Sequence, residues 1–387
     1  MILLQLLNSL LLAYLAWGAI YQFTFSFAGI FYKNKTVKSA KKMRRIAVFI
    51  PAYKEDGVII ETAKAALNQQ YPTNLYEVIV IADKLKSETM NQLSNLPIQV
   101  VEVAFEKSTK AKALNQALSQ LKGWNFEIAV VLDADNIMQH DFLSRANDRF
   151  EAGCQALQGR RAAKNEQSGF ALLDAASEDV NNHILCRGHQ SLGLSARLAG
   201  SGMAFDYNLF QSIMAKVTAI GGFDKELELR FTQKGVKVEY DELAIIFDEK
   251  VSQSNQFSRQ RSRWLAAQYR YAKQFLLRGV VAFIFKGNID FFNKTLQMTL
   301  PPRLIIPIVL FLGTLMNALF SSDVVLLWLS ALVFSGISFI LAMPKYCFQV
   351  KNLKMWVNIP RAFGATIMAL TRLREANRVF IHTSHHV

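Results

Sequence analysis

Apolar residues dominate both ends of the chain, whereas apolar and polar stretches alternate through its middle. Residues 1–32 contain no Asp, Glu, Lys or Arg and consist largely of Leu, Ala, Phe and Ile. A charge-free stretch of this length is sufficient to cross a hydrocarbon core of about 30 Å. It lacks the basic start of a secretory signal, so we expect it to be retained. The pattern therefore predicts an N-terminal transmembrane anchor over residues 1–32.

A second apolar region, nearer the C-terminus, predicts two more membrane-spanning helices. Leu304–Ser322 and Val324–Pro344 are free of charge, and Asp323 alone separates them. We expect a pair of transmembrane helices within residues 303–345, joined by a tight turn. The alternative for these apolar stretches is that they are buried core helices of a soluble protein.

The segments on either side of this pair combine apolar and charged residues. Residues 280–300 interleave aromatic side chains with Lys286, Asp290 and Lys294, which is typical of helices that lie in the membrane interface. We therefore expect interfacial helices over residues 276–302. The segment 346–387 is expected to be a cytoplasmic or interfacial tail. Within it, the apolar stretch 356–370 contains Arg361 and is either interfacial or a further span.

Between residues 46 and 275, short apolar runs alternate with polar, helix-like stretches. Buried β-branched runs separated by helices predict an α/β fold with a mostly parallel sheet covered on both faces. The expected strands are Arg45–Pro51, Glu77–Ala82, Ile98–Ala104 and Glu127–Leu132, and the expected helices include Gly57–Gln70 and Lys110–Leu121. Ligands of such sheets bind beyond the carboxyl ends of the strands. In this chain those ends carry Tyr53–Glu55, Asp83 and Asp133–Asp135.

The distribution of charge narrows the choice of partners. The formal net charge of +14 suits nucleic acid, an anionic membrane surface or anionic substrates. Residues 33–45 hold a basic run without any acid directly after the expected anchor, which favours anionic membrane lipids over nucleic acid as the partner. The positive-inside rule places this run, Arg303 and Lys345 in the cytoplasm. We therefore expect a multi-pass protein of the cell membrane with a cytoplasmic catalytic domain over residues 46–275.

Some common kinds of site are not supported by the sequence. No GxGxxG follows the first expected strand and no GxxxxGK[ST] occurs, so neither the dinucleotide-binding nor the P-loop motif is present. Cys154, Cys186 and Cys347 are odd in number and widely spaced, and they show no metal-ligand spacing. We expect them to be reduced packing residues.

The triplet Asp133-Ala134-Asp135 is the first candidate for chemistry. Because side chains alternate along a strand, its two carboxylates point the same way and repel each other unless a cation lies beside them. Hard oxygen ligands select Mg²⁺ or Mn²⁺, which keep open positions for phosphate oxygens. Taken alone, the triplet fits equally well a turn that caps the following helix.

Six short segments along the middle of the chain, one of which contains the Asp133-Ala134-Asp135 triplet, favour a functional role for it. They are VFIPAYKED at 48–56, VIVIAD at 78–83, KAKALNQAL at 110–118, VVLDAD at 130–135, GSGMAF at 200–205 and QRSRW at 260–264. Their order resembles that of the family 2 glycosyltransferases over roughly residues 45–275, and QRSRW resembles the Q-(Q/R)-x-R-W signature of the processive branch. The resemblance implies the GT-A fold, a nucleotide-sugar-binding α/β domain, and transfer with inversion at the anomeric carbon.

The resemblance also implies a donor site in the first half of the domain. The residues that match nucleotide-contacting positions are Pro51, Ala52, Glu55, Asp83 and Asp133. Lys112 and Asn115 fall in the segment that closes the nucleotide pocket, and Asp135 matches the metal ligand. The implied donor is a UDP-sugar, and the implied cofactor is Mg²⁺ or Mn²⁺.

The second half of the domain matches the acceptor side of the family. The segment that resembles the turn beneath the acceptor consists of Gly200, Ser201 and Gly202. In the family, a further motif holds the pyrophosphate and forms the floor of the acceptor site. The residues that resemble this motif are Gln260, Arg263 and Trp264.

The general base is implied by a degraded motif. The family usually shows Glu-Asp ahead of a helix, whereas this chain has Phe223-Asp224. The register points to Asp224 as the base, with Glu226 or Glu228 as the fallback, and a structural alternative for Asp224 is helix N-capping. An inverting displacement needs one base opposite the leaving group and a counter-charge for the departing diphosphate.

The expected function is an inverting, metal-assisted glycosyltransferase that moves a sugar from a UDP-sugar to a hydroxyl of a glycan or lipid-linked acceptor at the membrane. One alternative is a non-processive transferase acting on a polyprenyl-linked sugar, because three expected spans are few for a chain that extrudes a polymer alone. The other is a catalytically inactive membrane scaffold that retains the fold. Against the scaffold stand the charged and aromatic residues of the motifs, Asp133, Asp135, Asp224, Arg263 and Trp264.

Overall fold

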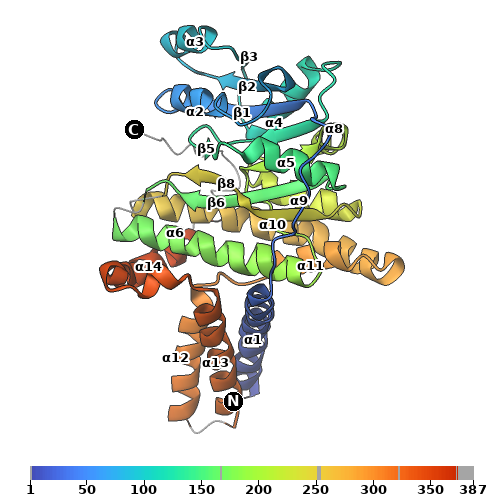
Figure 1. The fold of residues 1–387 in the computed structure, drawn as a ribbon. Helices are drawn as coiled ribbons and strands as arrows, with labels where there is room; N and C mark the ends of the chain where they lie inside the picture. Colours follow the sequence, from blue (N-terminus) through green and yellow to red (C-terminus); the bar gives the residue numbers. More distant parts are fainter. Residues whose placement is uncertain (1, 166–167, 251–253, 321–322, 372, 374–387) are drawn as a thin grey trace.

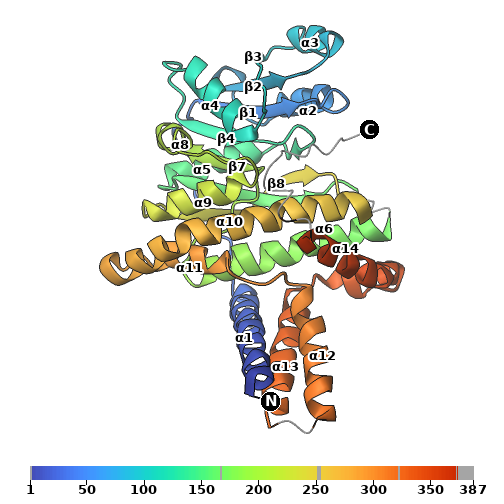
Figure 2. The same ribbon diagram turned by 180° about the vertical axis from the view of Figure 1, so that it is seen from behind.

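The protein consists of an α/β domain, a layer of helices beneath it, and a stalk of three apolar helices (Figures 1 and 2). The computed structural model describes residues 2–165, 168–250, 254–320, 323–371 and 373. The N-terminus lies at the far end of the stalk, and the turn between the two C-terminal stalk helices lies at the same end.

One eight-stranded sheet organises the domain, in the order β3-β2-β1-β4-β7-β6-β8-β5. The strands are β1 (Ile46–Tyr53), β2 (Tyr76–Asp83), β3 (Gln99–Val103), β4 (Ile128–Val131), β5 (Ile137–Met138), β6 (Ala156–Ala163), β7 (Met203–Asp206) and β8 (Val238–Asp248). The first four are parallel, which confirms the predicted strands to within one or two residues. The β4–β7, β6–β7 and β5–β8 pairs are antiparallel, so the sheet as a whole is mixed.

Helices cover both faces of the sheet because alternate residues of the central strands are apolar on each side. Ala47 and Phe49 of β1 face the side covered by α4 (Lys110–Gln120), α8 (Tyr207–Met214) and α9 (Phe223–Gln233). Ile46, Val48 and Ile50 face the side covered by α2 (Ile59–Ala66), α3 (Ser87–Ser94) and α5 (Phe142–Glu151). A short 3₁₀ turn, η1 (Thr73–Leu75), precedes β2.

The helical layer beneath the sheet joins the domain to the stalk (Figure 1). It contains α6 (Gly169–Asn181), the π-helical η2 (Asn182–Gly188), α7 (His189–Ser191), α10 (Ser254–Lys286), α11 (Ile289–Gln297), η3 (Lys345–Phe348), η4 (Val350–Asn358) and α14 (Ile359–Thr371). The helix α10 continues without a break across residues 275 and 276, where we expected the catalytic domain to end. One continuous helix therefore belongs both to the domain and to the helical layer beneath it.

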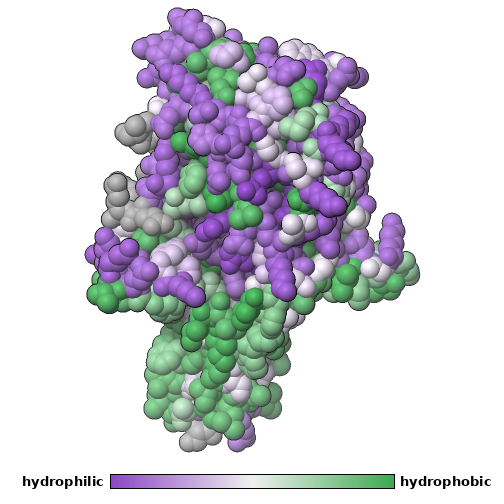
Figure 3. Space-filling view, viewed as in Figure 1, coloured by the Kyte–Doolittle hydropathy of each residue, from purple (hydrophilic) through white to green (hydrophobic). Residues whose placement is uncertain are grey.

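The stalk is formed by α1 (Ile2–Ile30), α12 (Ile305–Leu319) and α13 (Val325–Ala342), and its surface is almost uniformly apolar (Figure 3). By length and composition, α1 and α13 can cross a membrane, whereas α12 has 15 residues and is about 22 Å long. The three helices pack through a small core that includes Leu15, Ile306 and Trp328. A Cβ at Gly313 would lie 2.0 Å from the Trp328 ring, so glycine is required for α12 and α13 to approach this closely.

The basic segment 33–45 lies against the side of the domain. Figure 1 shows it climbing the side of the domain from the top of α1 to β1. Its second half is held by acids and carbonyls there: Arg44 Nη1 lies 2.6 Å from Glu151 Oε2, Lys42 pairs with Glu127, and Arg45 donates to the Trp124 carbonyl at 2.9 Å. Part of the basic run is therefore paired with acids of the domain itself, which sequence spacing could not reveal.

Apolar side chains also project from the helical layer at the level where the stalk begins. On one flank Leu277, Ile284 and Phe285 of α10 are exposed, and on the other Val350 and Val357 of η4 are exposed. Figure 3 shows apolar patches on both flanks beside the stalk. The interfacial placement of residues 276–302 and of part of the tail stays a prediction.

Candidate active site

A cavity of about 350 Å³ opens at the carboxyl ends of β1, β2 and β4, between the sheet, α9 and α10. This is the edge at which parallel strands present their following residues to a ligand. The predicted site residues that line it are Pro51, Ala52, Glu55, Asp83, Asp133, Asp135, Gly200, Asp224, Gln260, Arg263 and Trp264. The structure thus brings together residues separated by more than 200 positions in the chain.

Two predicted residues, Ser201 and Gly202, lie buried behind the cavity wall. The Ser201 hydroxyl accepts a hydrogen bond from the Asp133 backbone N–H at 2.9 Å, and so it positions the end of β4. Gly202 has a φ of 63°, and a Cβ there would lie 2.6 Å from Ile246. These residues support the site without facing it.

The other two, Lys112 and Asn115, also fall outside the cavity lining. Lys112 is exposed and donates to the Lys107 carbonyl at 3.0 Å. Lys110, two residues earlier on α4, lines the cavity instead. Residues two apart on a helix point in nearly opposite directions, so only one lysine of the KAK triplet can face the site.

Lys110 connects the two halves of the cavity. Its ammonium pairs with the Asp133 carboxylate and donates to the Gly200 carbonyl at 2.8 Å. It also lies 4.9 Å from the centre of the Phe223 ring. The aromatic residue that replaces the family's usual acid therefore carries a cation on its face.

The carboxylates of Asp133 and Asp135 are the candidate metal ligands. Both line the cavity, and Asn136 Nδ2 donates to Asp135 Oδ1 at 3.1 Å. Among the described residues no group of three His, Cys, Asp or Glu side chains could hold a metal ion. A hard cation bound here would take its remaining ligands from substrate oxygens and water, which is the usual manner of Mg²⁺ and Mn²⁺ at phosphates.

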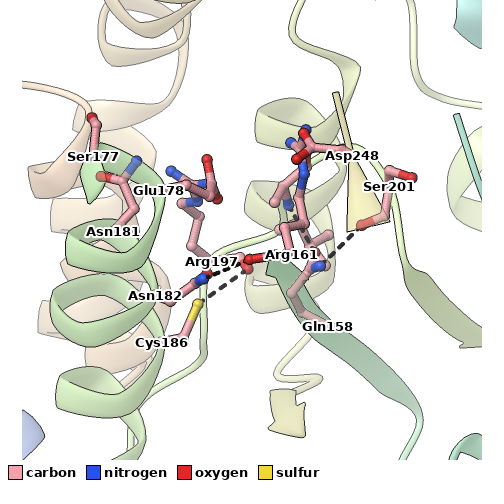
Figure 4. A network of polar contacts seen from close by, with 12 residues as sticks. Gln158, Arg161, Ser177, Glu178, Asn181, Asn182, Cys186, Arg197, Ser201 and Asp248 are labelled. Carbon is pink, nitrogen blue, oxygen red and sulfur yellow. Dashed lines mark hydrogen bonds and ion pairs between the residues drawn. The ribbon is translucent and has the colours of Figure 1, made fainter. Parts of the chain in front are cut away.

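Two arginines that sequence reasoning missed, Arg161 and Arg197, form a cationic wall (Figure 4). Arg161 pairs with Asp248 and donates to the Ala199 carbonyl at 2.7 Å, and Arg197 Nη2 lies 2.7 Å from Glu178 Oε1. Burial alone would raise the pKa of Glu178, but Arg197 and Arg161 outweigh it and lower that pKa to about 2. No motif marks these arginines, since each lies between the segments that carry the resemblance.

The acid at the start of α9 differs from its neighbours in what it contacts. Asp224 lines the cavity. Glu226 is buried and pairs with Arg230 at 2.6 Å, and Glu228 is buried and lies 3.4 Å from Lys294 Nζ. Gly222 precedes the helix with a φ of 65°, which turns the chain so that the first turn of α9 faces the cavity. Of the three acids considered as a base, only Asp224 is placed to meet a substrate.

One face of α10 closes the cavity. Gln260, Arg263, Trp264 and Ala267 follow the i, i+3, i+4, i+7 spacing of a single helix face, and all four line the cavity. Arg261 points the other way, lying 3.6 Å from Asp174 of α6 and 4.9 Å from the Trp264 ring. Burial lowers the pKa of Arg263.

A family model described as glycosyltransferase-like family 2 matches residues 44–267, more than half of the chain. The chain belongs to this family. The match covers the sheet, the cavity and the motif of α10, and it confirms the resemblance inferred from the ordered segments.

Relatives within the family are distant. The chain is 23% identical over 261 residues to the probable glycosyltransferase YdaM of Bacillus subtilis, covering 62% of this chain and 59% of that protein. It is 26% identical over 239 residues to the beta-monoglucosyldiacylglycerol synthase of a Nostoc species, covering 58% and 49%. The chain therefore spans about half the length of the curated relatives that it matches.

Among solved structures, the chain is similar to the mannosyltransferase PcManGT of Pyrobaculum calidifontis in complex with GDP-Man and Mn²⁺. The TM-score is 0.54 at 16% identity, covering 94% of this chain and 98% of that one. At this identity the likeness concerns the fold, and it confirms the expected GT-A architecture.

Proposed function

We propose that this chain is an inverting, metal-assisted glycosyltransferase that moves a sugar from a nucleotide-sugar, a UDP-sugar in our reading, to an acceptor hydroxyl at the membrane. One observation carries the proposal: a single cavity is lined by Asp224, by the cationic wall of Arg161 and Arg197, and by Arg263 of α10. A glycosyl transfer needs both groups, a base for the incoming hydroxyl and positive charge for the departing diphosphate.

The donor would lie across the carboxyl ends of β1, β2 and β4. Pro51, Ala52, Glu55 and Asp83 form the part of the cavity that suits a nucleoside. Lys110 and the arginines would face the diphosphate, where cations stabilise the charge that develops on the leaving group. Family membership and the GT-A fold support this orientation.

The reaction would be a single displacement. The acceptor oxygen attacks the anomeric carbon from the face opposite the diphosphate, and the bond from that carbon to the diphosphate oxygen breaks with its electron pair leaving on the nucleoside diphosphate. Asp224 takes the hydroxyl proton. One displacement inverts the anomeric configuration.

A divalent cation would be held by Asp135 with Asp133 beside it. The carboxylate oxygens are the hard ligands that Mg²⁺ and Mn²⁺ prefer, and the similar mannosyltransferase structure contains Mn²⁺. The cation would neutralise charge on the diphosphate. Lys110, which pairs with Asp133, would hold that carboxylate in place.

The acceptor would be presented from the bilayer. The stalk, with the apolar flanks of α10 and η4, would place the cavity just above a membrane surface. A relative that is named as a synthase of a glucosylated diacylglycerol favours a lipid-linked hydroxyl over a polysaccharide end and a single transfer over processive extension. A polyprenyl-linked sugar is also an acceptor with a lipid-linked hydroxyl.

The catalytic domain would lie in the cytoplasm, because the N-terminus and the α12–α13 turn share the far end of the stalk and Lys345 lies at the near end. Lys38 is exposed on the side of the domain. A Lys38→Cys variant in intact cells should resist an impermeant thiol reagent, and ready labelling would invert this topology.

Donor hydrolysis by the purified full chain tests the activity. UDP-glucose, UDP-N-acetylglucosamine and GDP-mannose would be compared with Mn²⁺ and with EDTA, each with and without diacylglycerol or a polyprenyl-linked sugar. The proposal expects metal-dependent release of one nucleoside diphosphate, increased by a lipid acceptor. An inactive scaffold would release none from any donor.

A further inference from the structure

A second cavity, of about 520 Å³, lies where the stalk meets the domain. Its walls come from the last residues of α1, the end of α13 with the start of η3, the α6–η2 helix and Arg160 of β6. Because α1 and α13 both end here, the cavity lies at the depth where apolar helices give way to charged segments.

The polar wall of this cavity carries more positive than negative charge. Arg160, Arg187 and Lys345 line it together with two acids, Asp179 and Glu242. Arg187 pairs with Glu242, and Arg160 Nη2 lies 3.4 Å from Asp179 Oδ1. One cation is in excess, and Lys345 is the exposed one.

Hydrogen-bond donors in the same wall are only partly used. The Asp179 carboxylate also accepts a bond from the Tyr346 hydroxyl at 2.9 Å, so it is shared between two donors. The buried Arg187 Nε has no hydrogen-bond partner among the residues that the structure describes. A cavity wall with one unpartnered N–H donor and excess positive charge is matched to an anion rather than to a cation.

The opposite wall is apolar and continues down the stalk. Ile30 of α1 with Leu341 and Met343 at the end of α13 line the cavity. On α1, Phe23 and Phe27 precede Ile30 at helical spacing, so the three share a face, and the Phe23 ring lies 5.0 Å from that of Phe334 on α13. An apolar stripe therefore runs from the stalk to the polar wall.

We propose that this cavity binds the phosphate head of an anionic phospholipid, with the acyl chains lying along the stripe of Phe23, Phe27 and Phe334. A soluble anion would use only the polar wall, whereas a lipid uses both walls. The inference rests on the membrane placement proposed above, but it is independent of sugar transfer.

This site is separate from the active site, although the two are neighbours. Arg160 and Arg161 are consecutive on β6, so their side chains leave opposite faces of the strand. Arg161 lines the active-site cavity and Arg160 lines the second one. The bound lipid would therefore be an accessory ligand and not the acceptor.

The second cavity adds a cation to those of the basic segment 33–45, some of which are paired with the domain. The cations of that segment at Lys42 and Arg44 are paired with the domain. Lys345, by contrast, stands at the end of α13 on the cavity rim.

The test uses the full chain in dodecyl maltoside with a fluorescent phosphatidylglycerol, whose binding is followed by anisotropy. Lys345→Gln should weaken binding about five-fold, the effect of one basic residue on an anionic lipid surface. Lys351→Gln is the matched control, since it removes an exposed lysine from the adjacent 3₁₀ helix outside the cavity and should change binding less than two-fold. Arg160→Gln should act in the same direction as Lys345→Gln.

Competition distinguishes the source of the phosphate. Unlabelled phosphatidylglycerol should displace the probe, whereas phosphatidylcholine and millimolar inorganic phosphate should not. Equal displacement by phosphatidylcholine, displacement by inorganic phosphate, or wild-type affinity in Lys345→Gln would each overturn the proposal. Donor hydrolysis in the same preparations is a separate readout. If the protein binds phosphatidylglycerol selectively but hydrolyses no nucleotide-sugar, the lipid site is supported and the proposed transferase activity is contradicted.

Discussion

Lys294 of α11 and Glu228 of α9 form an ion pair, with Nζ 3.4 Å from Oε1, although their side chains are only 0% and 2% exposed. The second Glu228 oxygen accepts the Leu198 backbone N–H at 2.5 Å, and Leu198 lines the active-site cavity. Lys294 Nζ also lies 3.4 Å from Nδ1 of His189. The other ring nitrogen of His189, Nε2, lies 3.1 Å from the hydroxyl of Tyr21 on α1. Buried polar contacts thus connect the stalk to the helix that carries Asp224.

Breaking this pair on one side should destabilise the protein. Lys294→Met leaves the Glu228 carboxylate buried without its cation, which typically costs about 3–5 kcal/mol of unfolding free energy. Thermal unfolding in detergent measures the loss, and the double variant Lys294→Met/Glu228→Gln should recover at least half of it. Lys42→Met, which breaks the exposed pair with Glu127, should cost about 1 kcal/mol or less. Equal losses in the two single variants would contradict the assigned role.

Stability should fall as the medium becomes more acidic than about pH 6.5. Burial, reinforced by Lys294, holds the pKa of His189 well below the ordinary value of 6.5, and burial lowers the pKa of His183 as well. Below pH 6.5 the unfolded chain binds protons that the folded chain does not, so unfolding becomes easier until the folded pKa is reached. Each histidine contributes up to about 1.4 kcal/mol per pH unit. His189→Gln should flatten the dependence of the unfolding midpoint on pH, and a wild-type pH dependence in that variant would contradict the role assigned to His189.

The two lysines of α4 give a matched pair of variants. Lys110→Met removes the cation beside Asp133 and should lower kcat/KM for the donor at least about ten-fold, because a charged hydrogen bond in the site contributes roughly 1.5–3 kcal/mol. Lys112→Met, two residues along the same helix, should stay within about two-fold of wild type. If Lys112→Met lost activity while Lys110→Met kept it, Lys112 would be the lysine that faces the donor, as the sequence resemblance implied.

The parallel half of the fold was predictable because its strands are continuous apolar runs separated by helices. The strands β6 and β7 were not predicted, since Arg160 and Arg161 interrupt one and the other has only four residues. Strands this short or this polar depend on pairing with residues distant in sequence.

The residues of the candidate site also fall into a group that could be predicted from the sequence and a group that could not. Residues that follow strands, such as Asp83 and Asp133, could be placed because topology brings strand ends together. Arg161 and Arg197 could not be found, because the position of Arg161 depends on the pairing of β6 with the distant strand β8 and that of Arg197 on a buried partner, Glu178. Lys112 was preferred to Lys110 because a motif gives the segment but not the direction in which each side chain points.

Asp224 should be needed for the transfer step and not for donor binding. Asp224→Asn keeps the size of the side chain but cannot accept the proton, so transfer should fall by at least about 10²-fold. Isothermal titration with UDP should give an unchanged affinity. Glu226→Gln is the control, since Glu226 pairs with Arg230 away from the cavity and should retain most transfer activity. Loss of UDP binding and of stability together in Asp224→Asn would indicate a structural aspartate.

Metal dependence should follow Asp135. Asp135→Ala removes one proposed ligand, and turnover in saturating donor should be abolished while the unfolding midpoint in detergent stays near that of wild type. Direct Mn²⁺ binding in the presence of UDP, measured by electron paramagnetic resonance, should weaken in the same variant. Full activity in EDTA would contradict a role for a divalent cation in the reaction.

The attachment of segment 33–45 to the side of the domain has a consequence for how substrates meet. A slack tether would let the domain swing through a hemisphere above its anchor and search for acceptors in solution. Here the Ala40 backbone N–H donates to Asp148 at 2.7 Å and Arg44 is held by Glu151, so the connection between α1 and β1 has little free length. With α1 inserted in a bilayer, as proposed above, the domain would keep the height and tilt of that helix, and it could still diffuse laterally and rotate about the bilayer normal. The encounter with a lipid-linked acceptor would then be a two-dimensional search, governed by acceptor density in the leaflet.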